Sequence, residues 1–201
     1  ALTHLESAIA ITSEPAERGP LLTRAAEAAA AAAALTKGTE YGRQAVAAFE
    51  QAGDEGSRLR AAGTLGSALL DNDQLEDAVE LLERSAEEAA PYPEIRADLL
   101  ARSARAYMRL TRDEEAVEAA DRAIVIAEPL RLDRITAEAF ANKGSALMKL
   151  GRLREPVIFL RAGAELAHEV GDYDLELRAR SNLSVFLSMQ DLTAAIALRS
   201  E

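Results

Sequence analysis

Apolar residues recur at intervals of three and four along nearly the whole chain. Between residues 57 and 90 they include Ala62, Leu65, Leu69, Leu75, Val79 and Leu82. This spacing places them on one face of a helix, and they never alternate as the residues of a strand would. The pattern therefore predicts amphipathic helices over residues 1–13, 20–36, 39–52, 57–71, 74–90, 94–110, 113–128, 133–150, 154–170, 174–189 and 191–200.

A repeat underlies these helices. A small residue is followed three places later by a large one in four pairs: Gly66 and Leu69, Ala104 and Tyr107, Gly144 and Leu147, Ser184 and Leu187. The intervals between the small residues are 38, 40 and 40 positions. Breakers separate successive helix pairs at Gly53, Pro91, Pro129 and Gly171, and Gly38, Asn72, Thr111 and Gly151 are expected at the turn inside each pair. Residues 1–201 thus form one domain of about five helix pairs.

The small residues have a mechanical explanation. Where two helices cross, Gly, Ala or Ser lets the backbones approach to about 8–10 Å, and the large residue one turn later fills the adjacent groove. Neither helix of a pair can bury its apolar stripe alone. The pairs must therefore stack into an all-α solenoid with a core that is continuous along the chain. Pro156 falls in the first turn of its helix, where a missing N–H is tolerated.

Composition excludes several classes of protein. Cysteine is absent, which removes disulfides, thiolate metal sites and cysteine nucleophiles. A net charge of -11 opposes sequence-independent binding to nucleic acid. No apolar run approaches the ~20 residues that span a bilayer. Because the chain starts at Ala1 inside an apolar-periodic segment, we expect part of a longer polypeptide and no signal peptide.

The residues Leu65, Gly66, Leu69, Ala78 and Leu82, with their echoes around Gly144 and Leu160, resemble the tetratricopeptide repeat (TPR), lengthened from about 34 to about 40 residues. The resemblance covers essentially the whole chain, and it departs from the family pattern at Lys143 and Pro156. It implies a right-handed solenoid in which the first helix of each pair lines the concave surface.

A narrower resemblance concerns the segments LDNDQLEDAVELLERSAEEA and AFANKGSALMKLGRLREPVIFLRAGAELAHEVGD. They are similar to the helical repeat region that follows the nucleotide-binding module of large bacterial signalling ATPases, including those linked to adenylate cyclase or to LuxR-type DNA-binding domains. This resemblance implies a cytoplasmic regulator whose catalytic and DNA-binding parts lie outside these residues.

The chain shows no pattern typical of catalysis. His4 and His168 each stand alone, and the glycines do not form a phosphate-binding loop. Acidic runs such as Glu76, Asp77, Glu80 and Glu83 are typical of solvated helix faces. We therefore expect no enzyme activity, no metal and no cofactor.

Charge differs between the two helices of each pair. The first helices carry more basic than acidic residues by our count, whereas the second helices at 74–90 and 113–128 each carry a net charge of -5. Together with the family resemblance, this predicts a relatively basic concave groove that attracts acidic ligands. No direct contact with nucleic acid or membrane is expected.

The candidate partner-binding residues are Arg102, Arg105, Asn142, Arg178 and Asn182. A side-chain amide can pair with a peptide group, and a guanidinium can hold a carboxylate through two hydrogen bonds. In the alternative interpretation the asparagines bond to neighbouring helices and the arginines are solvated. Met108, Met148 and Met189 form either an apolar floor of the groove or part of the core.

Two functional hypotheses remain. The first is a protein-interaction module that binds a peptide or another domain of the same protein in the concave groove. The second is a structural element that forms homodimers or larger assemblies through apolar faces at the two ends, namely Leu2, Leu5 and Ile9 and Leu192, Ile196 and Leu198.

Overall fold

The computed structural model describes the backbone of residues 2–199 and the side chains of residues 2–191. Within this part the chain forms α-helices and no strand, as the all-α prediction requires. The helices are α1 (Leu2–Ile11), α2 (Pro15–Ala31), α3 (Leu35–Ala52), α4 (Glu55–Asp71), α5 (Leu75–Glu88), α6 (Pro93–Arg109), α7 (Asp113–Ala127), α8 (Asp133–Lys149), α9 (Glu155–Glu169) and α10 (Tyr173–Arg199). Across residues 2–199, no helix combines the length and the apolar character needed to cross a membrane.

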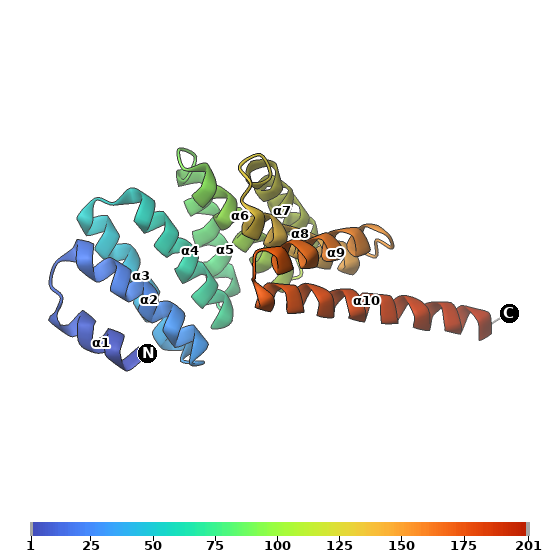
Figure 1. The fold of residues 1–201 in the computed structure, drawn as a ribbon, viewed down its shortest axis with the longest axis horizontal. Coiled ribbons are helices and arrows are strands. Elements are labelled where there is room, and N and C mark those ends of the chain that lie inside the picture. Colours follow the sequence, from blue (N-terminus) through green and yellow to red (C-terminus); the bar gives the residue numbers. More distant parts are fainter. Residues whose placement is uncertain (1, 200–201) are drawn as a thin grey trace.

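The helices form two layers of a right-handed solenoid (Figure 1). The inner layer consists of α2, α4, α6, α8 and α10, each in contact with the next. The outer helices α3, α5, α7 and α9 each pack between two consecutive inner helices. Among the described residues the outer backbones do not come close to one another, although the long side chain of Arg122 of α7 reaches Glu83 of α5. Because the inner helices are close together and the outer helices are farther apart, the array curves and the inner layer lies on its concave side.

Close helix crossings confirm the role predicted for the small residues. A Cβ atom on Gly66 would lie 2.5 Å from Leu82 Cδ2 of the next helix, and one on Gly144 would lie 2.8 Å from Leu160 Cγ. The core between the layers consists largely of alanine and leucine, and one continuous cluster extends from Leu59 of α4 to Ala139 of α8. Pro156 lies in the first turn of α9, as predicted.

The predicted limits of α2 and α3 are wrong. Helix α2 starts at Pro15 and contains Pro20, and Gly38 lies inside α3. The turn is made by the end of the polyalanine segment, where Ala33 has a φ of 54°. Alanine carries no local turn signal, so packing decides the position. A side chain at Gly38 would point at the α2 carbonyl of Ala26, 3.6 Å from a Cβ atom.

The predicted break near Gln190 is also wrong, because α10 is one helix of 27 residues. Gly53, Gly151 and Gly171 have positive φ and end other helices. From residue 172 to the end of the chain the sequence contains neither Gly nor Pro, so no local signal stops α10. Its C-terminal half projects beyond the stacked pairs (Figure 1).

Candidate functional site

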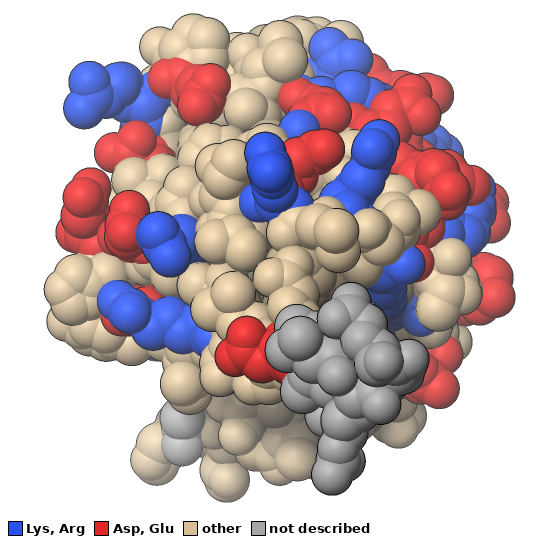
Figure 2. All heavy atoms as spheres, turned by 90° about the vertical axis from the view of Figure 1, so that its right-hand side faces the viewer, with Lys and Arg blue, Asp and Glu red and all other residues tan. Residues whose placement is uncertain are grey.

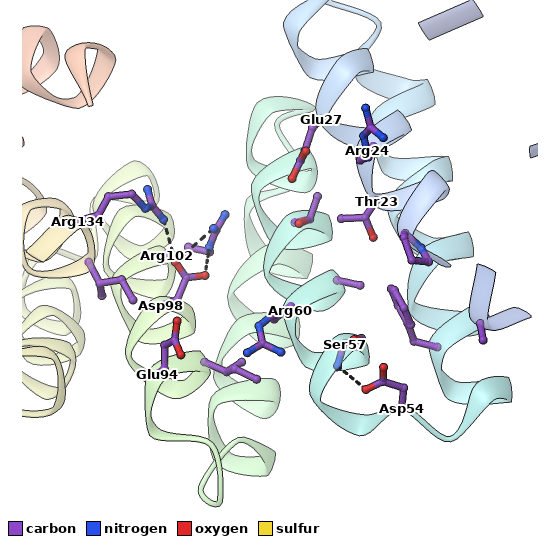
Figure 3. Close-up of a pocket in the computed structure, with 17 residues that line it drawn as sticks. Thr23, Arg24, Glu27, Asp54, Ser57, Arg60, Glu94, Asp98, Arg102 and Arg134 are labelled. Carbon is purple, nitrogen blue, oxygen red and sulfur yellow. Dashed lines mark hydrogen bonds and ion pairs between the residues drawn. The ribbon is translucent and has the colours of Figure 1, made fainter. Parts of the chain in front are cut away.

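A large cavity lies on the concave side, and we call it the inner groove (Figure 3). It has a volume of about 650 Å³ and runs across α2, α4, α6 and the start of α8. Its floor includes the buried side chains of Phe49, Ala61, Ile95 and Ile135. Charged side chains from the inner helices surround this floor, so the groove offers both apolar and ionic contacts.

The predicted excess of basic residues does not hold in the inner groove. Its lining contains four arginines and four acidic residues: Arg24, Arg60, Arg102, Arg134, Glu27, Asp54, Glu94 and Asp98. Two of the acids have local roles at helix starts. Asp54 accepts a hydrogen bond from the backbone N–H of Ser57 at 3.0 Å, which lowers the pKa of its carboxyl, and Glu94 lies in the first turn of α6. On the end of the molecule that Figure 2 shows, basic and acidic side chains are likewise interspersed.

A smaller cavity of about 250 Å³ continues the concave face toward α10, and we call it the arginine hollow. It is lined by Arg105, Arg134, Glu138, Asp172, Asp174, Leu175 and Arg178. Arg134 lines both cavities, so the inner groove and the arginine hollow are neighbours on the concave face.

Arg134 is the centre of an ionic network between the two cavities. Its guanidinium nitrogens lie 3.2 Å from Asp98, 3.7 Å from Glu138 and 3.6 Å from Asp172. These carboxylates come from α6, α8 and the loop before α10. One arginine thus ties three consecutive inner segments together. Sequence reasoning missed Arg134, although it lies ten residues before Gly144 and shares the inner face with Glu138 and Asn142.

Arg105 and Arg178 are paired more loosely. The nearest ion-pair contacts are 3.9 Å from Arg105 to Asp71 and 3.9 Å from Arg178 to Glu138. Burial lowers the pKa of Arg178, and the positive charge of Arg105 lowers it further, against the opposing effect of Glu138. Two guanidiniums therefore line one small hollow without a close carboxylate partner of their own.

Asn142 is buried and lies in contact with Arg178. It is 1% exposed, its Nδ2 donates to the Ala101 carbonyl at 3.0 Å, and its Oδ1 accepts from Arg178 Nη1 at 3.1 Å. Asn182 is half-buried, and its Nδ2 donates to Ser145 Oγ at 2.9 Å. Both asparagines thus connect neighbouring inner helices, as the alternative interpretation of the sequence held for them.

Arg102 makes similar connections from α6 to α4. Its Nε donates to Asp98 at 2.7 Å, and its Nη1 donates to Ser67 Oγ at 2.5 Å. Although burial opposes it, the charge of Asp98 raises the pKa of Arg102. Arg102 is therefore a partly buried tie between helices, and the interpretation in which it is solvated does not apply.

The methionines do not line either cavity. Met108 and Met148 are half-buried, and Met189 is exposed on α10. The apolar floor of the inner groove comes instead from Phe49, Ile95 and Ile135. In the part of the chain with described side chains, no group of three or more His, Asp or Glu residues is arranged to hold a metal ion.

The comparisons with known proteins bear on the fold. No protein-family model matches the sequence, and no curated protein matches it. Aspartyl phosphate phosphatase F from Bacillus subtilis superposes with a TM-score of 0.74 at 18% identity, over 93% of this chain and 49% of the phosphatase. Nearly identical TPR-like repeats from Podosopora anserina give a TM-score of 0.66 at 23% identity, over 94% of both chains.

A third similar structure is a Signal Transduction ATPase with Numerous Domains (STAND) that has a tetratricopeptide repeat sensor, from Pyrococcus horikoshii. Its TM-score is 0.69 at 14% identity, and the match covers 90% of this chain and 28% of the ATPase. This chain thus spans about half of the phosphatase and about a quarter of the ATPase. The similarities show that the chain has the TPR-like solenoid fold predicted from its repeats.

Proposed function

We propose that this chain is a non-enzymatic protein-interaction module whose concave face binds a peptide or a partner domain through carboxylate groups. The supporting observation is the arginine hollow, where Arg105 and Arg178 lie 3.9 Å or more from their nearest carboxylates. A ligand carboxylate that enters the hollow can replace these long contacts by short charge-assisted hydrogen bonds.

The five candidate residues have three different roles in such a site: contact with the ligand, orientation of an arginine and spacing of the helices. Arg105 and Arg178 contact the ligand. Asn142 orients the Arg178 guanidinium by accepting from Nη1, which leaves Nη2 for the ligand. Arg102 and Asn182 set the spacing of the inner helices that carry these arginines. The inner groove beside the hollow takes apolar side chains of the same ligand on Phe49, Ile95 and Ile135.

The sequence resemblance to signalling ATPases and the similarity to the STAND structure support a proposal for the biological setting. The STAND protein has a tetratricopeptide repeat sensor, and its match to this chain covers 28% of that protein. In the proposed setting, this chain belongs to a bacterial, cytoplasmic regulatory protein. Its concave face binds a peptide or an acidic domain of the same protein, and occupancy is passed to output domains outside these residues.

The test uses a short peptide with two glutamates, one tryptophan and a free C-terminal carboxylate. Because the chain has no tryptophan, the fluorescence anisotropy of the peptide reports binding directly. We expect Arg105→Gln and Arg178→Gln each to weaken binding about tenfold, because each removes a charged donor.

Arg161→Gln is the control, because Arg161 is exposed on the outer helix α9. It should leave the affinity unchanged. Equal affinities for all three variants and the unmodified chain would refute the proposal, provided that circular dichroism shows the same helix content.

One observation supports self-association as a second role. Leu177, Val185, Leu187 and Met189 are exposed on α10, which has no outer helix after it among the described residues. At the other end, Ile9 is buried, with Leu2 and Leu5 packed against its cluster, so the predicted N-terminal apolar face is closed. The side chains of Leu192, Ile196 and Leu198 lie outside the described residues.

A further inference from the structure

A third cavity lies between α6 and α7, and we call it the outer groove. It has a volume of about 550 Å³, within the range of about 300–1,000 Å³ typical of ligand sites. Leu100, Val117, Val125 and Ile126 provide apolar surface, and Arg96 lies at its edge. None of these residues lines the inner groove or the arginine hollow.

In the preceding helix pair, the arginine at the position equivalent to Arg96 forms ion pairs. Arg58 of α4 lies 38 residues before Arg96, at the interval that separates Gly66 from Ala104. Its guanidinium pairs with Glu55 at 2.7 Å and with Glu88 of α5 at 2.5 Å. In the α4–α5 pair, then, a partly buried arginine is neutralised by two carboxylates.

In the following helix pair, the residue at the equivalent position is uncharged. Thr136 of α8 lies 40 residues after Arg96, is buried, and donates its hydroxyl to the Leu132 carbonyl at 3.2 Å. Leu166 of α9, the counterpart of Glu88, packs against a core cluster. In one neighbouring pair a charged residue therefore has a partner of opposite charge, and in the other both equivalent residues are uncharged.

The α6–α7 pair combines an arginine, as in α4, with an apolar residue on the facing helix, as in α9, so this arginine has no carboxylate partner among the described side chains. The counterpart of Glu55 is Pro93, and the counterpart of Glu88 is Ile126. The Nε atom of Arg96 is buried without a hydrogen-bond partner, and no ion pair of Arg96 is found in the described structure. A buried donor of a charged group that lacks a partner is costly, unless a ligand satisfies it.

On the solvent side of α7, Val125 likewise stands where the neighbouring outer helices have an acidic residue. It is 73% exposed, whereas its counterparts in α5 and α9 are the exposed glutamates Glu87 and Glu165. Glu87 and Glu88 of α5 thus correspond to the apolar residues Val125 and Ile126 in α7. Val125 is open to solvent, and Ile126 is partly buried against the core cluster of α4 to α8; both line the groove beside Arg96.

The opposite end of the outer groove is negative. Glu114 and Glu118 line it near the start of α7 and are in no ion pair found among the described side chains. The other charged lining residues are occupied, because Asp121 pairs with Lys143 at 2.5 Å and Arg122 pairs with Glu83 at 3.0 Å. Glu118 and Ile126 are eight residues apart, or about 12 Å along the helix.

We infer that the outer groove binds a peptide segment with a carboxylate at one end, apolar side chains in the middle and a lysine or arginine at the other end. The carboxylate pairs with Arg96 as Glu88 pairs with Arg58. The apolar side chains cover Val125 and Ile126, and the cation reaches Glu114 and Glu118. This site lies between α6 and α7, shares no lining residue with the inner groove or the arginine hollow, and does not depend on the proposed concave site.

The decisive variant introduces into α7 the glutamate that α5 has at the equivalent position. Ile126→Glu gives Arg96 a carboxylate at the position of Glu88, so it should close the site to the ligand while circular dichroism shows the same helix content. A phage-displayed library of random twelve-residue peptides is selected on the 201-residue chain and counter-selected on Ile126→Glu. We expect the retained peptides to contain an acidic residue, apolar residues and a basic residue in that order or its reverse.

A retained peptide, synthesised with a tryptophan, is then measured by fluorescence anisotropy. Ile126→Glu, Arg96→Met and a peptide with Gln in place of its acidic residue should each weaken binding about tenfold or more. Arg178→Gln should leave the affinity unchanged, which separates this site from the concave one. The inference is overturned if no peptide distinguishes the chain from Ile126→Glu, or if the retained peptides bind Arg96→Met as well as the original chain.

Discussion

At the scale of single residues, long polar side chains hold the inner helices together. Lys149 of α8 donates to the Met108 carbonyl of α6 at 2.6 Å, and Arg109 of α6 donates to the Leu70 carbonyl of α4. Asn142 makes the same kind of bond to Ala101. Such bonds reach from one inner helix to the carbonyls of the helix before it, so polar residues on the concave face contribute to the spacing of the solenoid as well as to binding.

Asn142→Ala tests this structural contribution. The change leaves the buried Ala101 carbonyl without its donor and Arg178 without its acceptor, so we expect the free energy of unfolding to fall by about 1–3 kcal/mol. Urea denaturation monitored by circular dichroism measures it. Asn72→Ala removes only a turn bond to Gln74 and should cost less than about 0.5 kcal/mol. Equal losses in the two variants would show that Asn142 is no more important to stability than a turn residue.

At the scale of helices, the distance of closest approach between the two layers depends on individual glycines. Gly144 sits where α8 meets α9, and an added Cβ would lie 3.0 Å from the backbone nitrogen of Leu160. A backbone atom cannot move aside as a side chain can. Gly56, in the first turn of α4, has its nearest neighbour at 3.6 Å in the flexible side chain of Arg60.

The two glycines should therefore respond in opposite ways to alanine. Gly144→Ala forces α8 and α9 apart and should cost about 1–3 kcal/mol of the free energy of unfolding. Gly56→Ala meets only ordinary contact distances and gains helix propensity, so it should stabilise the chain by about 0.5–1 kcal/mol. Thermal and urea unfolding of both variants provide the comparison. A stable Gly144→Ala variant would mean that small residues do not set the crossing distance.

At the scale of the whole molecule, the two ends of the solenoid differ. The N-terminal helix α1 covers α2 and buries Ile9. At the other end, α10 has α9 on one side only, and it exposes Leu177 and Leu187. The matching positions of α8, 40 residues earlier, are the buried Ala137 and Leu147. An apolar helix face that is buried in one unit and open in the last is a natural surface for self-association.

The open face of α10 predicts weak pairing between copies. Light scattering should give a mass above 21.5 kDa that rises with protein concentration, and the double variant Leu177→Lys, Leu187→Lys should remain at 21.5 kDa. Arg161→Gln is the control and should associate like the original chain. A constant mass of 21.5 kDa for the original chain would eliminate self-association and leave the binding role of the concave face unaffected.

Much of the fold could be predicted from local patterns in the sequence. Apolar residues at intervals of three and four fix helices, and Gly53, Gly151 and Gly171 end helices because they adopt positive φ at little cost. The recurrence of Gly66 and Gly144 at a fixed interval identifies the crossings between layers. These features depend on residues that are close together in the chain, so the order of residues is sufficient to show them.

The candidate sites depended on tertiary structure for a physical reason. Asp98 and Arg134 are 36 residues apart, and stacking brings them to 3.2 Å. The number of charges on a helix cannot show that Arg102 is tied to α4, whereas the Nε atom of Arg96 is buried without a hydrogen-bond partner among the described residues. The turn at Ala33 was likewise decided by packing, because the polyalanine segment carries no local turn signal. The sequence by itself determined which faces are apolar and how often they repeat. Only the folded chain decided which charges neutralise one another and which remain for a ligand, because that depends on distances across the stacked helices.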